Sequence, residues 1–186
     1  IDFVVDKGPF AKTVPVPLNP FTLVGATTRA GLLSKPMRER FGLFHHVDFY
    51  PVEDIQSILV RSARILALEA EDASLHEIAQ RARGTPRVAN RLLRRVRDFA
   101  AVKADGRLSH LVTLDALALE GVDPLGLDEH DRKYLRTLID FYSGGPVGLE
   151  TIASTLNEDA DNLEDVVEPF LLKIGFLKRT PRGREL

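Results

Sequence analysis

The chain has 186 residues, of which 44% are hydrophobic and 28% are charged, which is the composition of an ordinary globular protein. It contains no cysteine, which excludes disulfides and thiolate metal sites and favours a reducing, cytoplasmic environment. No apolar run approaches the roughly 18 residues that a membrane span requires. The net charge is −2, so any nucleic-acid binding must depend on local basic patches.

Two segments are rich in bases and contain no acid. In residues 81–97 the bases are Arg81, Arg83, Arg87, Arg91, Arg94, Arg95 and Arg97. In residues 178–184 they are Lys178, Arg179, Arg182 and Arg184. The chain starts with Ile1 rather than Met, inside a predicted strand. We therefore expect it to be a fragment of a longer protein.

The N-terminal residues have the pattern of strands. Residues 1–5 and 12–16 flank the turn-forming residues 6–9, which predicts a hairpin. Residues 21–26 form a short apolar run that ends in small residues, as a buried parallel strand does. A second such run covers residues 47–50.

From Pro51 onward the apolar spacing becomes helical, which predicts a first helix. Ser74-x-x-Glu77 resembles a capping box at the start of a second helix. A third helix follows Gly84-Thr85-Pro86, and a short fourth begins at Thr113. The pattern therefore predicts a small bundle of four helices.

A linker with Gly and Pro spans residues 121–126. Three helices are predicted after it, at residues 131–142, 149–156 and 162–174, and Gly175 is expected to end the last one. A basic hairpin then covers residues 176–186. Three helices followed by a hairpin are typical of a winged helix.

Three positions could contact phosphate. Thr28 lies at the end of the predicted strand, where a hydroxyl can orient water or bind a terminal phosphate, although an ordinary polar turn is the more common reading. Arg40 could reach a neighbouring subunit's nucleotide, or it could be a plain surface arginine. Arg87 follows Pro86 in a first helical turn whose free amides favour an anion; a solvated helix start is an equally good interpretation.

The remaining charged segments are less specific. The run from Arg91 to Arg97 could face nucleic acid, but a solvated face paired to acids of an adjacent domain is favoured. The third helix of the predicted winged helix is acidic, with Glu158, Asp159, Asp161, Glu164, Asp165 and Glu168. Such a helix should not lie against phosphates, so the basic wing is the better candidate for DNA contact, with a charged surface hairpin as the alternative. The histidines show no metal-ligand spacing.

Together these segments resemble RuvB, a family of bacterial hexameric Holliday-junction motors of the AAA+ class. The resemblance runs in order along the whole chain. It is carried by residues 21–31, 40–42, 83–98, 144–149 and 175–184. Within them, the arginine-rich string from Arg83 to Asp98 and the ending Thr-Pro-Arg-Gly-Arg are highly specific.

The resemblance implies an α/β plus all-α fold in three parts. Residues 1–51 would be the tail of an AAA+ α/β ATPase domain. Residues 52–122 would be its small helical-bundle lid domain, and residues 125–186 a C-terminal winged-helix DNA-binding head. ATP and Mg²⁺ would be the cofactors.

The resemblance also implies residue roles. Thr28 corresponds to sensor 1, Arg40 to an arginine finger acting in trans, and Arg87 to sensor 2 acting in cis. Tyr50 would lie against the adenine. The wing residues implied to bind DNA are Arg179, Arg182 and Arg184, and the hairpin residues implied to bind RuvA are Val4, Val5 and Phe10.

The resemblance also implies partners. They are double-stranded DNA at a Holliday junction, RuvA, RuvC in the resolvasome and five further copies of the protein in a homo-hexamer. The Walker A loop and the Walker B acids that hold Mg²⁺ would precede Ile1, so we expect this chain alone not to hydrolyse ATP. Pro15 and Pro17 depart from the charged residues expected in the hairpin.

Two other functions fit parts of the sequence. A non-enzymatic winged-helix DNA-binding regulator would explain the C-terminal third but leaves Thr28, Arg40 and Arg87 unexplained. A clamp-loader-like AAA+ subunit would share these residues but usually carries a helical collar in place of a wing. A hexameric ring that encircles duplex DNA would favour the motor.

Overall fold

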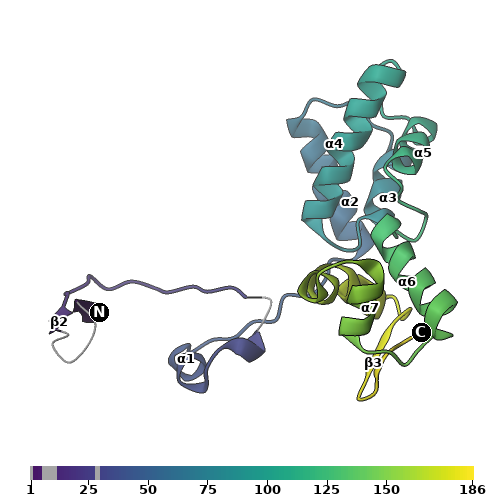
Figure 1. The fold of residues 1–186 in the computed structure, drawn as a ribbon. Helices are drawn as coiled ribbons and strands as arrows, with labels where there is room; N and C mark the ends of the chain where they lie inside the picture. Colours follow the sequence, from purple (N-terminus) through teal and green to yellow (C-terminus); the bar gives the residue numbers. More distant parts are fainter. Residues whose placement is uncertain (1, 6–11, 28–29) are drawn as a thin grey trace. The chain divides into compact units, whose positions relative to one another are not determined.

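A computed structural model describes residues 2–5, 12–27 and 30–186 (Figure 1). The chain divides into two compact units, Ile1–His46 and Val47–Leu186. Within the described part, no helix is long and apolar enough to cross a membrane.

The N-terminal unit holds a hairpin and two short helical segments. Strands β1 (Asp2–Val5) and β2 (Lys12–Pro15) are antiparallel, with Asp2 opposite Pro15, so the predicted hairpin is confirmed. A 3-10 turn, η1 (Ala30–Leu32), and helix α1 (Lys35–Arg40) follow.

The two predicted buried strands after the hairpin are wrong. Residues 21–26 and 47–50 form no strand in the structure, and Phe21, Val24 and Val47 are exposed. A strand is stabilised by ladder hydrogen bonds to a neighbour, and among the described residues the sheets are β1–β2 and the C-terminal hairpin. The apolar pattern alone carries no information about whether such a neighbour is present.

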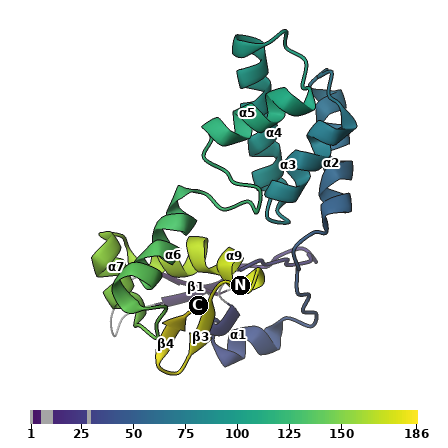
Figure 2. The same cartoon turned by 90° about the vertical axis from the view of Figure 1, so that its right-hand side faces the viewer.

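The second unit begins with a bundle of four helices, as predicted. They are α2 (Val52–Ile65), α3 (Asp72–Arg81), α4 (Pro86–Lys103) and α5 (His110–Leu119). Their apolar faces meet in one core, which includes Leu59, Ile78, Leu93, Val96 and Leu117. Figure 2 shows these helices gathered into one body.

The predicted capping box at Ser74 is wrong. Helix α3 begins three residues earlier than this capping box implies, with Glu71 as its N-cap, and no side chain caps it. The fully buried Ser74 hydroxyl instead forms a hydrogen bond with the buried Thr113 hydroxyl of α5. The hydroxyl is therefore used for packing between helices, which a local sequence motif cannot reveal.

The C-terminal domain confirms the predicted winged helix. It consists of α6 (Glu129–Tyr142), α7 (Leu149–Leu156), a third helix in three consecutive pieces, and a hairpin. The pieces are α8 (Ala160–Asn162), the π-helical turn η2 (Leu163–Val167) and α9 (Glu168–Lys173). The hairpin pairs β3 (Lys178–Thr180) with β4 (Gly183–Glu185).

Backbone hydrogen bonds connect the hairpin to the rest of this domain. Val147, before α7, exchanges two hydrogen bonds with Arg184 at 3.0 and 2.8 Å. A Cβ at Gly183 would collide with the Val147 backbone, so this close approach requires glycine. Gly175 has a φ of +78° and ends the third helix, as predicted.

Candidate functional site

The start of α4 forms the first candidate site. Thr85 is its N-cap with an extended backbone and no side-chain cap, and Pro86 occupies the first turn. The first amides of this 18-residue helix are therefore open to a ligand, and the helix dipole favours an anion there. Arg87 is exposed in the same turn.

An exposed aromatic ring lies beside this helix start. The backbone N–H of Tyr50 donates to the carbonyl of Gly84 at 2.9 Å, which fixes Tyr50 beside the loop that leads into α4. Tyr50 is 43% exposed. An open helix N-terminus, an arginine and a flat ring offer partners for a phosphate and for a base, so these residues fit a nucleotide such as ATP.

The remaining predicted site residues before position 47 belong to the other compact unit of the chain. Arg40 is the exposed last residue of α1 and belongs to the N-terminal unit. Thr28 and Phe10 lie outside the described residues. Val4 and Val5 lie in β1, in register with Thr13 and Lys12.

The wing arginines form the second candidate site, and two of the three form ion pairs with acids of the same domain. Arg184 donates from Nε to Glu168 at 2.9 Å, and Arg179 donates from Nε to the other carboxylate oxygen at 2.7 Å. Both also lie within ion-pair distance of Glu164. Arg182, in the turn, and Lys178 are exposed and pair with no acid in the part of the chain that the structure describes.

Glu168 is the centre of this network. Its side chain is fully buried, and it also accepts a hydrogen bond from the Tyr134 hydroxyl of α6 at 2.8 Å. Burial and the neighbouring Glu168 charge raise the pKa of Tyr134 above its usual value. Burial disfavours the charged form of Arg184, but hydrogen bonding and charge from Glu168 outweigh it and raise the pKa of Arg184. The wing is therefore held to the third helix by ion pairs with Glu168.

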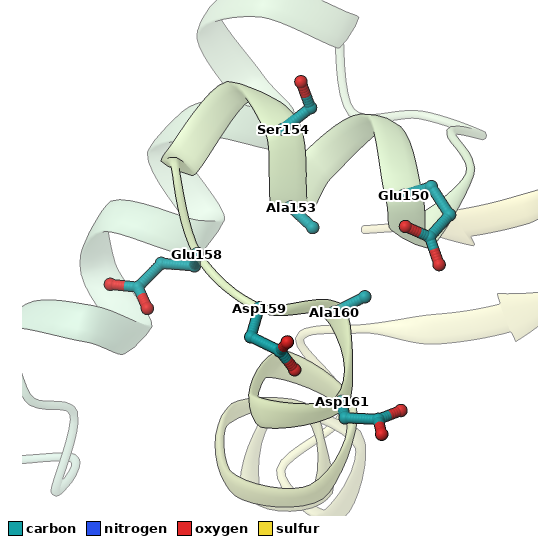
Figure 3. Close-up of a pocket in the computed structure, with 7 residues that line it drawn as sticks. All are labelled: Glu150, Ala153, Ser154, Glu158, Asp159, Ala160 and Asp161. Atoms are coloured by element: carbon teal, nitrogen blue, oxygen red, sulfur yellow. The ribbon is translucent and has the colours of Figure 1, made fainter.

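This network revises the expectation that the whole third helix repels DNA. Glu164 and Glu168 are neutralised by Arg179 and Arg184, so two of the six acids no longer count as free negative charge. Three of the other four acids lie around a hollow between α7 and α8, shown in Figure 3. Its acidic lining residues are Glu150, Glu158, Asp159 and Asp161. Phosphate would be repelled there, whereas the wing tip carries exposed bases.

The arginines along α4 were expected to pair with acids of an adjacent domain. In the structure Arg91, Arg94 and Arg95 do face outward. Their contacts stay within the bundle, however: Arg95 lies 3.6 Å from Glu120, and Arg94 donates to the carbonyl of Asn90 in its own helix. Among the residues of the second unit, this face of α4 therefore pairs within the bundle and not with the head.

One arginine of the same basic segment does reach the next domain, and the sequence reading missed it. Arg83 donates to Asp131 at 2.6 Å and to the carbonyl of Gly126 at 2.8 Å. It also lies 2.8 Å from Asp128. Asp128 and Asp131 form a reciprocal capping box at the start of α6. That Asp-x-x-Asp spacing was a readable signal for the helix start, but not for its arginine partner.

Comparison with known proteins agrees with this architecture. Three family models match consecutive segments: the Holliday junction DNA helicase RuvB P-loop domain over residues 1–47, the RuvB AAA lid domain over 50–123, and the RuvB C-terminal winged helix domain over 124–186.

Individual relatives match along nearly the whole chain. The Holliday junction branch migration complex subunit RuvB of Ligilactobacillus salivarius is 55% identical over 184 residues, which is 99% of this chain and 55% of that protein. The subunit of the same name from Dehalococcoides mccartyi is 56% identical over 185 residues, 100% of this chain and 53% of that protein. The solved Thermotoga maritima RuvB Holliday junction branch migration motor has a TM-score of 0.85 and 52% identity, covering 91% of this chain and 57% of that one.

A helical bundle with an open α4 terminus, followed by a winged helix, is the arrangement of an AAA lid domain and a C-terminal winged-helix domain. The chain belongs to the RuvB family. It spans about half the length of the curated relatives that it matches.

Proposed function

We propose that this chain is part of an ATP-driven DNA translocase that, together with RuvA, drives branch migration of Holliday junctions in recombination and repair. The names of the curated relatives support this function. A cytoplasmic homo-hexamer on double-stranded DNA, with RuvC joining at the junction, is the corresponding assembly. Residues 1–51, 52–122 and 125–186 would serve as ATPase tail, lid and DNA-binding head.

The lid would sense ATP through Arg87 and Tyr50. An arginine at an open helix N-terminus can contact a terminal phosphate, and the ring of Tyr50 can lie against the base. Mg²⁺ would supply charge neutralisation on the phosphates when it is bound. Thr28 would sense the terminal phosphate in the same subunit, and Arg40 would stabilise the charge that develops on the neighbouring subunit's ATP.

The head would bind the DNA backbone without reading sequence, and the hairpin would dock on RuvA through apolar side chains such as Val4, Val5 and Phe10. Of the wing arginines, Arg182 is the best placed for phosphate, because Arg179 and Arg184 are engaged by Glu168. Arg179 and Arg184 would act mainly by fixing the wing. A motor that travels along arbitrary DNA requires such indifference to sequence.

One observation carries the proposal: Tyr50 is hydrogen-bonded to the loop that leads into the α4 start, where Arg87 lies. The same chain continues into a winged helix. The test is branch migration of a synthetic four-way junction by a full-length protein that contains this chain. Parent protein should convert the junction with ATP, and Arg87→Ala should abolish conversion while junction binding persists. ATP-independent conversion, or DNA binding with no nucleotide effect, would instead favour the regulator.

A further inference from the structure

Arg83 sits at the boundary between the lid and the head and has partners on both sides. Its side chain is only 15% exposed. From the end of α3 it reaches Asp128 and Asp131 at the start of α6, and its guanidinium carbon lies 4.8 Å from the ring centre of Phe170 in α9. One lid arginine therefore contacts the first and the third helix of the head.

Lys173 makes a second connection from α9 back to the lid. Its Nζ donates to the backbone carbonyl of Arg83 at 3.2 Å and lies 4.3 Å from the ring centre of Phe49. Phe49 directly precedes Tyr50, whose N–H is bonded to Gly84. The last turn of the head's third helix therefore touches both chain segments that build the candidate nucleotide site.

The backbone between these contacts leaves little room for adjustment. Arg83 itself has a φ of +59° and Gly84 a φ of +70°, both in the left-handed region. A Cβ at Gly84 would lie 2.8 Å from the Tyr50 carbonyl oxygen and 2.7 Å from Lys173 Nζ, so the three segments are packed tightly. Asp131, the acid that Arg83 binds, is itself 1% exposed.

We propose that Arg83 and Lys173 form an interdomain clamp that couples the nucleotide-facing start of α4 to the DNA-binding head. The two are positioning residues: Arg83 is separated from Arg87 by three residues, and Lys173 holds the segment that carries Tyr50. A shift of the α4 start on nucleotide binding would move the Arg83 anchor, and α6 and α9 would follow it. This inference rests on the proposed function for its ligands, but the clamp itself is a property of the chain.

The first experiment tests the clamp without ATP or DNA. The chain has no cysteine, so Val102→Cys in the lid and Phe141→Cys in the head, both exposed, can carry a pair of spin labels. The distance distribution between the labels should be narrow in the parent and should broaden in Arg83→Ala with Lys173→Ala. Arg94→Ala, an exposed arginine bonded within α4, is the matched control and should leave the distribution narrow.

The second experiment tests coupling in a full-length protein that contains this chain. Stimulation of ATP turnover by duplex DNA should fall about fivefold or more in Arg83→Ala, the lower end of typical coupling between sites. The affinity of this variant for DNA should stay unchanged. An unchanged affinity would show that the head still folds and that only the coupling is lost. Arg83→Lys should recover only part of the stimulation, since an ammonium cannot reproduce the fork that binds two aspartates and a carbonyl. Lys173→Met, which keeps the stem, provides a milder variant if Arg83→Ala unfolds.

Unchanged label distances in the double variant would overturn the clamp. Broadened distances with intact DNA stimulation would overturn the coupling. If the parent showed no DNA-stimulated turnover at all, the proposed function would fail, and the distance measurement would still decide whether the clamp exists.

Discussion

The guanidinium of Arg184, on the second strand of the wing, lies 2.9 Å from the carboxylate of Glu168, which is fully buried in the third helix. A buried carboxylate is costly unless it is paired, and here Arg179 and Tyr134 share in its compensation. Two bases that look like DNA ligands in the sequence are therefore structural partners of an acid that looks like a repulsive surface charge.

Glu168→Ala should strongly destabilise the head, because Arg184 would keep only the more exposed Glu164 and the buried Tyr134 hydroxyl would lose its acceptor. The expected loss is about 3–5 kcal/mol of unfolding free energy, typical for breaking one side of a buried pair. Tyr134→Phe, which removes one hydrogen bond, should cost about 1–2 kcal/mol. Urea unfolding of the chain measures both, and Glu150→Gln, at an exposed residue of α7, is the control. Equal stability of Glu168→Ala and the control would contradict the central role of this acid.

Arg182→Ala should weaken DNA binding equally for unrelated sequences, and it should lower the salt slope of the binding constant by about one. Lys178→Ala should behave in the same way, because both bases are exposed and pair with none of the described acids. Arg184→Ala should instead lower the stability of the head more than its affinity for DNA. Duplex binding of two sequences over a salt series, with thermal unfolding of each variant, tests this. A loss confined to one sequence would show that the wing reads bases.

Arg40→Ala in a full-length protein should reduce ATP turnover by about 10³-fold or more, while nucleotide affinity stays nearly unchanged. Arg87→Ala should reduce both, since it would touch its own subunit's phosphate. Mixing Arg40→Ala subunits with subunits that cannot bind ATP provides the sharper assay. A finger that acts in trans predicts that the mixture regains a turnover that neither kind of subunit shows alone, whereas one that acts in cis predicts no recovery at any mixing ratio.

The stability of the lid should fall in acid through Glu77. Burial disfavours its charged form, but hydrogen bonds from Arg81 and His110 outweigh this and hold the pKa of Glu77 below its usual value of 4.5. A lowered folded-state pKa means that this stabilisation is fully present above pH 4.5 and is lost as the pH falls below it. Glu77→Gln should cost about 2 kcal/mol at neutral pH and should flatten the acid limb of the stability profile. A profile as steep as the parent's would assign the acid sensitivity to other carboxylates.

Local patterns were sufficient for most of the helical architecture. The helical spacing after Pro51, the proline at the start of α4 and Gly175 at the end of α9 each act within a few residues, so the sequence shows them directly. The winged-helix order and the C-terminal hairpin were readable for the same reason. Arg87 could be singled out because a helix start and its anion preference are local features.

The tertiary structure decided which charges are free. The pairing of Arg184 with Glu168 joins residues 16 positions apart, and that of Arg83 with Asp131 joins residues 48 positions apart. The spacing of residue types along the sequence predicts neither pair. The predicted strand at residues 21–26 was wrong because a strand depends on a neighbouring backbone that its own side chains do not specify. Local spacing determines where most of the helices form, whereas burial and distant partners determine whether an arginine binds phosphate or holds the fold together.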